Sequence, residues 1–256
     1  MQLDFDASIV ENYHSNSQKA RLLTENWIKT NMYCPRCGNR RLSQFENNRP
    51  VADFYCPLCK NEYELKSKSG PLGNKVNDGS YDAMIERITG NKNPDFFFMT
   101  YSKTNYAVND LILIPKHFFV PNMIEKRKPL AMTARRAGWV GCNIVIEKVP
   151  EQGKIAIISN GIVADMDTVL KKVDVSNRIV VNDIGGRGWM MDILNCINQL
   201  HGIVFTLSDM YAFEEELQMK HPMNGHIRPK IRQQLQILRD RGLLAFLGNG
   251  TYRKIV

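Results

Sequence analysis

One short stretch of the chain, DFYCPLCKNEYELKSKSG at residues 53–70, holds side chains that together could hydrolyse a phosphodiester bond. The run EYELKS alternates in polarity and predicts a β-strand, in which Glu64 and Lys66 face one pocket because side chains two residues apart point the same way. Phosphodiester hydrolysis of this type uses a divalent metal, and oxygen ligands suit Mg²⁺. We expect Glu64 and Asp53 to hold this ion with the carbonyl of Leu65. Lys66 would orient or activate the attacking water.

The order of these residues resembles the PD-(D/E)xK nuclease motif, with Pro50 ahead of Asp53 and then Glu64-x-Lys66. Such a spacing is weak evidence on its own because it occurs often by chance. The alternative interpretation is that Glu64, Lys66 and Lys68 form the solvated face of an edge strand.

Cysteine spacing predicts a structural zinc site inside the same region. Two Cys-x-x-Cys pairs are separated by eighteen residues, a spacing typical of four-cysteine zinc sites. The expected ligands are Cys34, Cys37, Cys56 and Cys59. Four thiolates leave no open position for water, so the expected role of the ion is to brace the connection between Asp53 and Glu64.

Composition excludes several classes of protein. The chain has 256 residues with an ordinary apolar content of 43%, which indicates a globular protein. No run of eighteen apolar residues and no signal peptide is present, so we expect no membrane partner. The formal net charge of +8 permits a polyanionic partner, and a nucleic-acid surface would have to be assembled by folding because no polybasic tract exists.

Periodicity predicts a mixed α/β fold with a central sheet in the first part of the chain. The expected helices are 16–31 (capped by Ser17), 82–88 and 165–173, the expected strands are 62–67, 95–101, 107–115 and 154–159, and a Gly- and Asn-rich loop is expected at 68–79.

The last seventy residues follow the order of a winged helix: three helices and a hairpin with a glycine turn. The helices are expected at 188–200, at about 208–220 with Ser208 as the cap, and at 226–241. A linker is expected near 175–187. We therefore divide the chain into a nuclease domain, 1–182, with its zinc site at 34–59, and a winged-helix domain, 183–256.

The third of these helices presents polar residues suited to DNA. Helical geometry makes Ile227, Ile231, Leu235 and Leu238 the buried face. Gln233 and Gln236 lie opposite, and glutamine suits the adenine edge in the major groove. The flanking arginines suit phosphates, and they are Arg228, Arg232 and Arg239.

A second candidate DNA contact is the run Arg135-Arg136-Ala-Gly-Trp139, which combines two cations with an aromatic ring. The arginines would bind phosphate or guanine, and Trp139 would lie against a base edge or methyl group. The alternative is an ordinary buried tryptophan beside surface charges.

Longer segments resemble the DpnI-type methyl-directed type II restriction endonucleases. They include SNSQKARLLTE, CPRCGN, FENNRPVADFYC, YELKSK, KPLAMTARRAGWVGCNI, RGWMMDILNCI and IRQQLQILRD, and are spread over nearly the whole chain. The resemblance implies a PD-(D/E)xK domain with zinc and a winged helix, which cleave GATC in duplex DNA when the adenine is N6-methylated. It also implies that both domains read the site, that Asp53, Glu64 and Lys66 are catalytic, and that the protein is bacterial and cytoplasmic.

We therefore expect an endonuclease that needs catalytic Mg²⁺, structural Zn²⁺ and no small-molecule cofactor, with adenine-methylated duplex DNA as its partner. The rival hypothesis is a non-enzymatic regulator of transcription built from a zinc ribbon and a winged helix. The two hypotheses differ at Asp53, Glu64 and Lys66, because a regulator has no need of that combination.

Overall fold

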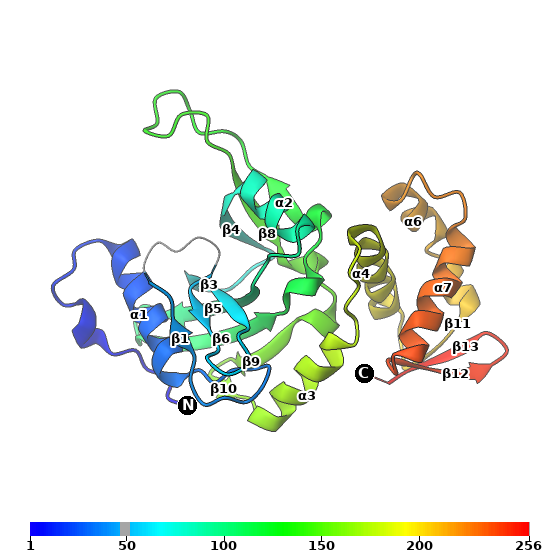
Figure 1. The fold of residues 1–256 in the computed structure, drawn as a ribbon, viewed down its shortest axis with the longest axis horizontal. Coiled ribbons are helices and arrows are strands. Elements are labelled where there is room, and N and C mark those ends of the chain that lie inside the picture. The colour runs from blue at the N-terminus through cyan, green and yellow to red at the C-terminus, as the bar shows by residue number, and fades with distance from the viewer. Residues whose placement is uncertain (47–51, 256) are drawn as a thin grey trace.

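In the computed structural model, which describes residues 1–46 and 52–255, strand β5 (Asp95–Ser102) lies at the centre of a seven-stranded mixed sheet (Figure 1). The strand order is β1-β2-β3-β5-β6-β9-β10, and β3 and β5 are parallel while the other neighbours are antiparallel. The other bounds are β1 Ser43–Gln44, β2 Phe54–Tyr55, β3 Glu62–Ser69, β6 Ala107–Ile114, β9 Ile155–Ser159 and β10 Ile162–Val163.

Alternation along β5 divides the hydrophobic core into two parts. Phe97 and Met99 point to one face of the sheet, where they pack into a core with α1 (Asn16–Asn31) and α3 (Met166–Asn177). Phe96 and Phe98 pack into the core on the other face. That face is covered by α2 and by a three-stranded antiparallel sheet of order β4-β8-β7. The bounds are α2 Tyr81–Thr89, β4 Lys75–Ser80, β7 Ile124–Lys126 and β8 Gly141–Val145.

The C-terminal unit is a helix-turn-helix with a wing, and the fold class expected from the sequence is confirmed. Its sheet has the order β11-β13-β12, and its wing turns at Asn249-Gly250. The bounds are α4 Ile184–Gln199, β11 Val204–Thr206, α5 Leu207–Tyr211, α6 Glu214–Lys220, α7 Ile227–Asp240, β12 Leu244–Gly248 and β13 Thr251–Lys254. Short 3-10 helices are η1 Ala7–Val10, η2 Lys116–Phe118, η3 Pro121–Met123, η4 Ile146–Lys148 and η5 Glu151–Gly153.

Helix α4 joins the two units, and it lies between the main sheet and α7 (Figure 1). The amides of Gln152 and Asn198 exchange two hydrogen bonds of 3.0 Å, and Asn195 Nδ2 donates to the carbonyl of Lys148 at 2.9 Å. One buried apolar cluster runs from Phe96 of β5 into the C-terminal unit. The two units therefore share a core and are not joined only by a linker.

Several boundaries in the first part differ from the sequence-based expectations. Residues 68–79 do not form one loop, because β3 continues to Ser69 and β4 begins at Lys75. The cap of α1 is Ser15 and not Ser17. Pro50 lies outside the described residues.

The C-terminal part also needs corrections. The expected linker 175–187 is shorter, since α3 continues to Asn177 and α4 begins at Ile184. The expected single helix near 208–220 is two helices, α5 and α6. The cap of α5 is Thr206, whose hydroxyl accepts from the Asp209 amide while the Asp209 carboxylate accepts from the Thr206 amide. None of the helices in the described ranges has the length and apolar character needed to cross a membrane.

Candidate active site and metal centre

Strand β3 directs Glu64 and Lys66 towards α2 and β4. Its parallel register places Glu64 beside Phe96 and Lys66 beside Phe98, the two β5 residues whose side chains enter the core on that face. Lys66 Nζ lies 2.5 Å from Glu64 Oε1, and the two side chains are 18% and 13% exposed. The sequence-predicted pair is thus brought together at a mostly buried position and does not form a solvated edge face.

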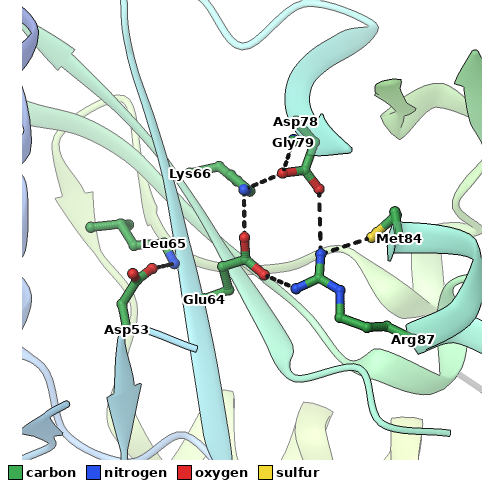
Figure 2. A network of polar contacts seen from close by, with 8 residues as sticks. All are labelled: Asp53, Glu64, Leu65, Lys66, Asp78, Gly79, Met84 and Arg87. Atoms are coloured by element: carbon green, nitrogen blue, oxygen red, sulfur yellow. Dashed lines mark hydrogen bonds and ion pairs between the residues drawn. The ribbon is translucent and has the colours of Figure 1, made fainter. Parts of the chain in front are cut away.

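Two further residues complete a network of charges around this pair (Figure 2). Lys66 Nζ also contacts Asp78 Oδ1 of β4, and the Asp78 side chain is only 2% exposed. Arg87 of α2 donates to Glu64 Oε2 at 3.1 Å and lies 4.0 Å from Asp78 Oδ2. Two cations therefore balance two carboxylates in this buried site. Charged side chains are tolerated away from water only when they are paired with opposite charge in this way.

Asp78 and Arg87 were not singled out from the sequence. The segment KVNDGS around Asp78 is rich in polar and turn-forming residues and shows no apolar alternation, so it was interpreted as loop. Its strand forms by pairing with β8, more than sixty residues further along the chain, where Asp78 lies opposite Cys142. For Arg87, helical spacing is a partial indication. It lies three residues after Met84 on the expected helix 82–88, and therefore on the same side of the helix as that residue, which the structure shows to be buried.

Asp53 lies on the side of β3 that faces β2. Its Oδ2 accepts a hydrogen bond from the Leu65 amide at 2.7 Å, just beyond the point where β2 stops pairing with β3. Asp53 is thus bound to the backbone of β3 at Leu65, next to Glu64, which is itself a residue of that strand (Figure 2).

Burial sets the protonation preferences of the site. Desolvation raises the pKa values of Glu64 and Asp53 above their ordinary range. Desolvation alone would lower the pKa of Lys66, but the carboxylates of Glu64 and Asp78 outweigh it and raise that pKa. The arrangement therefore favours a charged ammonium group between two carboxylates.

The donor set fits a hard divalent cation. The carboxylates of Asp53 and Glu64 and the Leu65 carbonyl are oxygen ligands of the kind that Mg²⁺ prefers. Asp78 Oδ2 is a buried carboxylate oxygen without a hydrogen bond from the described residues. It is therefore a further oxygen atom that could accept from a ligand or a metal-bound water. Both Glu64 oxygens are in contact with cations, and an ion binding Glu64 would compete with Arg87 for Oε2.

The four cysteines converge on one point. Their Sγ atoms all lie within 4.8 Å of one another, and the Cys34–Cys59 and Cys37–Cys56 pairs are both 3.6 Å apart. Four thiolates 2.3 Å from a tetrahedral zinc would be about 3.8 Å apart, so the spacing fits the ion. Within the described part of the chain, they are the one group of three or more such side chains placed to share a metal.

The two pairs form matching turns, which explains why the thiols meet. Each runs Cys-Pro-x-Cys and then a residue with positive φ, Gly38 at +74° and Lys60 at +61°. The Cys34 and Cys56 amides donate to the carbonyls five residues ahead, at 2.8 and 2.9 Å. Burial raises the pKa of Cys34; the pKa of Cys56 falls to about 7, because backbone hydrogen bonds outweigh burial.

The second cysteine turn lies between β2 and β3, so it takes the place of a hairpin turn. The Tyr63 hydroxyl of β3 lies 3.0 Å from Cys34 Sγ, which links the first turn to the same strand. A zinc ion bound here would fix the strand that carries Glu64 and Lys66 relative to Asp53.

The candidate DNA contacts on α7 lie on its exposed side. Ile227, Ile231, Leu235 and Leu238 are buried as expected, while Gln233 and Gln236 are exposed. The exposed arginines already have partners: Arg228 pairs with Glu214 at 2.7 Å, Arg232 donates to the Tyr211 hydroxyl at 2.7 Å, and Arg239 contacts Asp240.

The other candidates lie on a projecting finger, residues 127–140, between β7 and β8 (Figure 1). Its base is held by hydrogen bonds between Leu130 and both Trp139 and Gly138. The Arg136 guanidinium stacks 4.7 Å from the Trp139 ring, which is half-buried, and Arg135 is exposed. Trp139 is therefore not a core residue.

Two family comparisons cover almost the whole chain. The model of the DpnI, Dam-replacing family matches residues 1–181, and the model of the Dam-replacing HTH domain matches residues 185–254.

We predict about one zinc per chain by metal analysis, and its loss in Cys37→Ser or Cys56→Ser. Because metal binding is coupled to folding, the thermal midpoint of these variants should fall by more than about 10 °C. Cys196→Ala is the matched control, since this buried cysteine lies outside the cluster and its loss should leave the zinc content unchanged. A zinc-free wild-type chain with the same midpoint would contradict the assignment.

Proposed function

The chain belongs to the Dam-replacing family of DpnI-type restriction endonucleases, and on this premise we propose that it cleaves duplex DNA at GATC sites carrying N6-methyladenine. The proposed reaction is Mg²⁺-dependent hydrolysis by the module 1–182, aided by the DNA-binding module 183–256. The proposed setting is the bacterial cytoplasm. The observation that carries the chemistry is the buried contact of Lys66 with Glu64 on β3, beside Asp53.

Each residue of this site has a distinct proposed role. Asp53, Glu64 and the Leu65 carbonyl would hold Mg²⁺, which when bound supplies charge neutralisation at the phosphate and a more acidic water. Lys66 donates from Nζ and would orient the attacking water beside the scissile phosphate. Arg87 neutralises Glu64 in the structure described here, so its displacement would accompany metal binding.

We also assign Asp78 a positioning role. Its side chain is almost fully buried, and it contacts the same Lys66 Nζ that Glu64 contacts (Figure 2). A flexible lysine side chain has many rotamers, and two carboxylate partners restrict Nζ to the space between them. Asp78 would therefore act through Lys66 and not on DNA.

The proposed reading of DNA uses two surfaces. Gln233 and Gln236 of α7 would contact adenine edges in the major groove while Arg228, Arg232 and Arg239 contact phosphates. The finger would bring Arg135, Arg136 and Trp139 to the same site, with the ring of Trp139 offering an apolar surface to a methyl group. The finger leads into β8, and β8 pairs with β4, the strand that bears Asp78. The proposed DNA contacts of the finger and the residue that positions Lys66 are therefore attached to the same three-stranded sheet.

The rival regulator hypothesis is not favoured, because it gives no reason for burying Glu64, Lys66 and Asp78 in one network of charges. One incubation separates the two. Methylated plasmid with Mg²⁺ should be cut and unmethylated plasmid should not, whereas a regulator would bind DNA without cutting either.

We predict that Asp53→Ala, Glu64→Ala or Lys66→Ala lowers the cleavage rate by at least about a thousandfold, because each acts on charge that develops in the transition state. Binding of methylated DNA should remain within about tenfold of wild type, as measured by fluorescence anisotropy. Robust cleavage by Glu64→Ala would sink the assignment.

For Asp78→Asn, we predict a roughly 10- to 100-fold fall in kcat with little change in KM, since the change releases Lys66 on one side but leaves DNA contacts intact. The control is Asp82→Asn, at an exposed position in the first turn of α2, which should cleave normally. A rise in KM with normal kcat would instead assign Asp78 to DNA binding.

Methyl reading by α7 is tested in the full chain with the Glu64→Ala change, which prevents cleavage. A side chain that hydrogen-bonds the adenine edge contributes on the order of 1–3 kcal/mol of discrimination, so Gln233→Ala or Gln236→Ala should reduce the preference for methylated GATC by about tenfold. Arg232→Ala should weaken binding to both duplexes alike and reduce the salt slope by about one. If the glutamine variants keep the full preference, methyl recognition lies in the catalytic module alone.

A further inference from the structure

A cavity of about 230 Å³ lies at the junction of the two modules, away from the residues assigned to the active site. Its wall combines Arg36 of the first cysteine turn, Asn93 before β5, Lys116 of η2, the linker at Val181 and Arg187 of α4. A wider hollow shares Arg36, Asn93 and Lys116 with it, and its further charged lining residues are Lys60, Lys92 and Glu62.

The wall is positively charged. Arg36, Lys116 and Arg187 line the cavity, and none of the described lining residues is Asp or Glu. The buried Asp95 is near enough for its charge to act on Lys116 and Arg36, and its oxygens accept from the Lys116 amide at 2.8 Å and from Asn61 Nδ2 at 2.7 Å. One carboxylate against three cations still leaves the wall positive. The surroundings therefore favour an anion.

Arg187 is the most unusual of the three cations, because its side chain is buried at 5% exposure. Its hydrogen bonds go to the carbonyls of Ile88, Phe119 and Val181 and to the side-chain oxygen of Asn91. All four acceptors are neutral. No carboxylate of the described residues accepts a hydrogen bond from this guanidinium, and the charge of Asp183 acts on it only from a greater distance. An anion in the cavity would balance the positive charge more directly.

Asn93 gives the second, independent observation. Its side chain is 4% exposed, and neither Oδ1 nor Nδ2 has a hydrogen-bond partner among the described residues. An unsatisfied buried amide is costly, at about 1–3 kcal/mol, so a ligand is expected to supply its partners. Because the amide offers one acceptor and one type of donor, that ligand must both donate and accept.

We propose that the junction cavity binds a hydrogen phosphate group, held by Arg36, Lys116 and Arg187 and hydrogen-bonded to the Asn93 amide. Hydrogen phosphate fits both observations, because it is an anion that keeps a P–OH donor at neutral pH. Sulfate has the same size and charge type but no such donor. The source would be free phosphate or the terminal phosphate of a nucleotide, since both carry a P–OH group in their monoprotonated form and the wider hollow leaves room beyond the cavity. A phosphodiester of the DNA backbone has no P–OH at neutral pH and does not meet the requirement.

Binding would link four segments that line the cavity: the first cysteine turn, the α2–β5 connection, the linker and α4. The consequence is a measurable stabilisation of the full chain that does not depend on nuclease activity.

The test is thermal unfolding of the zinc-loaded full chain, purified without phosphate and with no added Mg²⁺. Phosphate should raise the midpoint in a saturable way, by roughly 5–10 °C at a hundredfold excess over Kd. Sulfate at equal ionic strength strengthens burial in general, so it is the control for non-specific salt effects. A phosphate shift no greater than the sulfate shift would overturn the proposal.

Two variants locate the site, and a third is the control. Asn93→Leu removes the amide at similar volume, and Lys116→Met removes one charge from an exposed side chain that the fold does not need. Both should reduce the phosphate shift to the sulfate level, while Lys172→Met, outside the lining, should keep it. A shift that persists in Lys116→Met and Asn93→Leu would place phosphate elsewhere and refute the site.

The source of the phosphate is distinguished by two further ligands. Adenosine monophosphate that gives the same saturable shift at lower concentration would support a nucleotide as the source. A duplex without terminal phosphates should leave the phosphate-dependent shift unchanged, and its loss would contradict the requirement for a P–OH donor. If adenosine monophosphate gives no shift and inorganic phosphate does, free phosphate is the ligand.

Discussion

The pairing of Lys66 with two buried carboxylates is the interaction on which the arrangement of the nuclease module depends. A lysine ammonium that is mostly removed from water is tolerated only with opposite charge in contact, and Glu64 and Asp78 provide it from two different strands. These strands belong to different sheets, so one ammonium group ties β4 to β3. Arg87 adds the fourth charge from α2, and the pocket is closed on that side by groups that neutralise one another.

The cysteine cluster sets the other half of the geometry. Strand β2 has only two residues, so besides this short pairing Asp53 is held against β3 by its own two hydrogen bonds, from its amide to the Tyr63 carbonyl and from the Leu65 amide to its carboxylate. The matching cysteine turns on both sides of this segment bring residues 34–37 and 56–59 to one point, and Tyr63 connects that point to β3. A metal at this point would replace the stabilisation that a longer hairpin would give, because it cross-links the chain where few backbone hydrogen bonds exist.

Much of this could be predicted from local patterns in the sequence. The alternation in EYELKS, the spacing of the cysteines and the buried face of α7 are properties of neighbouring residues, and each was correctly placed. Asp78 could not be found in this way, because KVNDGS becomes a strand only through its distant partner β8. Glycines misled the linker prediction for a local reason: Gly186 is inside α4, where its amide donates to the capping Asp183 carboxylate at 2.5 Å and a Cβ would lie 2.6 Å from that carboxylate.

The shared core between the modules bears on how two weak readings of a methyl group could combine. Suppose that each module discriminates by only one apolar contact. The selectivity of the chain would then be the product of the two selectivity factors only when both contacts are made on one DNA site, or on two sites at a fixed spacing. A flexible linker would permit many relative positions, whereas α4 is packed against Lys148, Gln152 and the core that includes Phe96. Under the phosphate proposal, the charge of Arg187, which is buried in the same junction and hydrogen-bonded to neutral acceptors, would make the rigidity of this packing depend on the anion content of the solution. On this reasoning, a phosphate bound at the junction would narrow the range of relative positions of finger and α7, and selectivity for methylated DNA would rise with its occupancy.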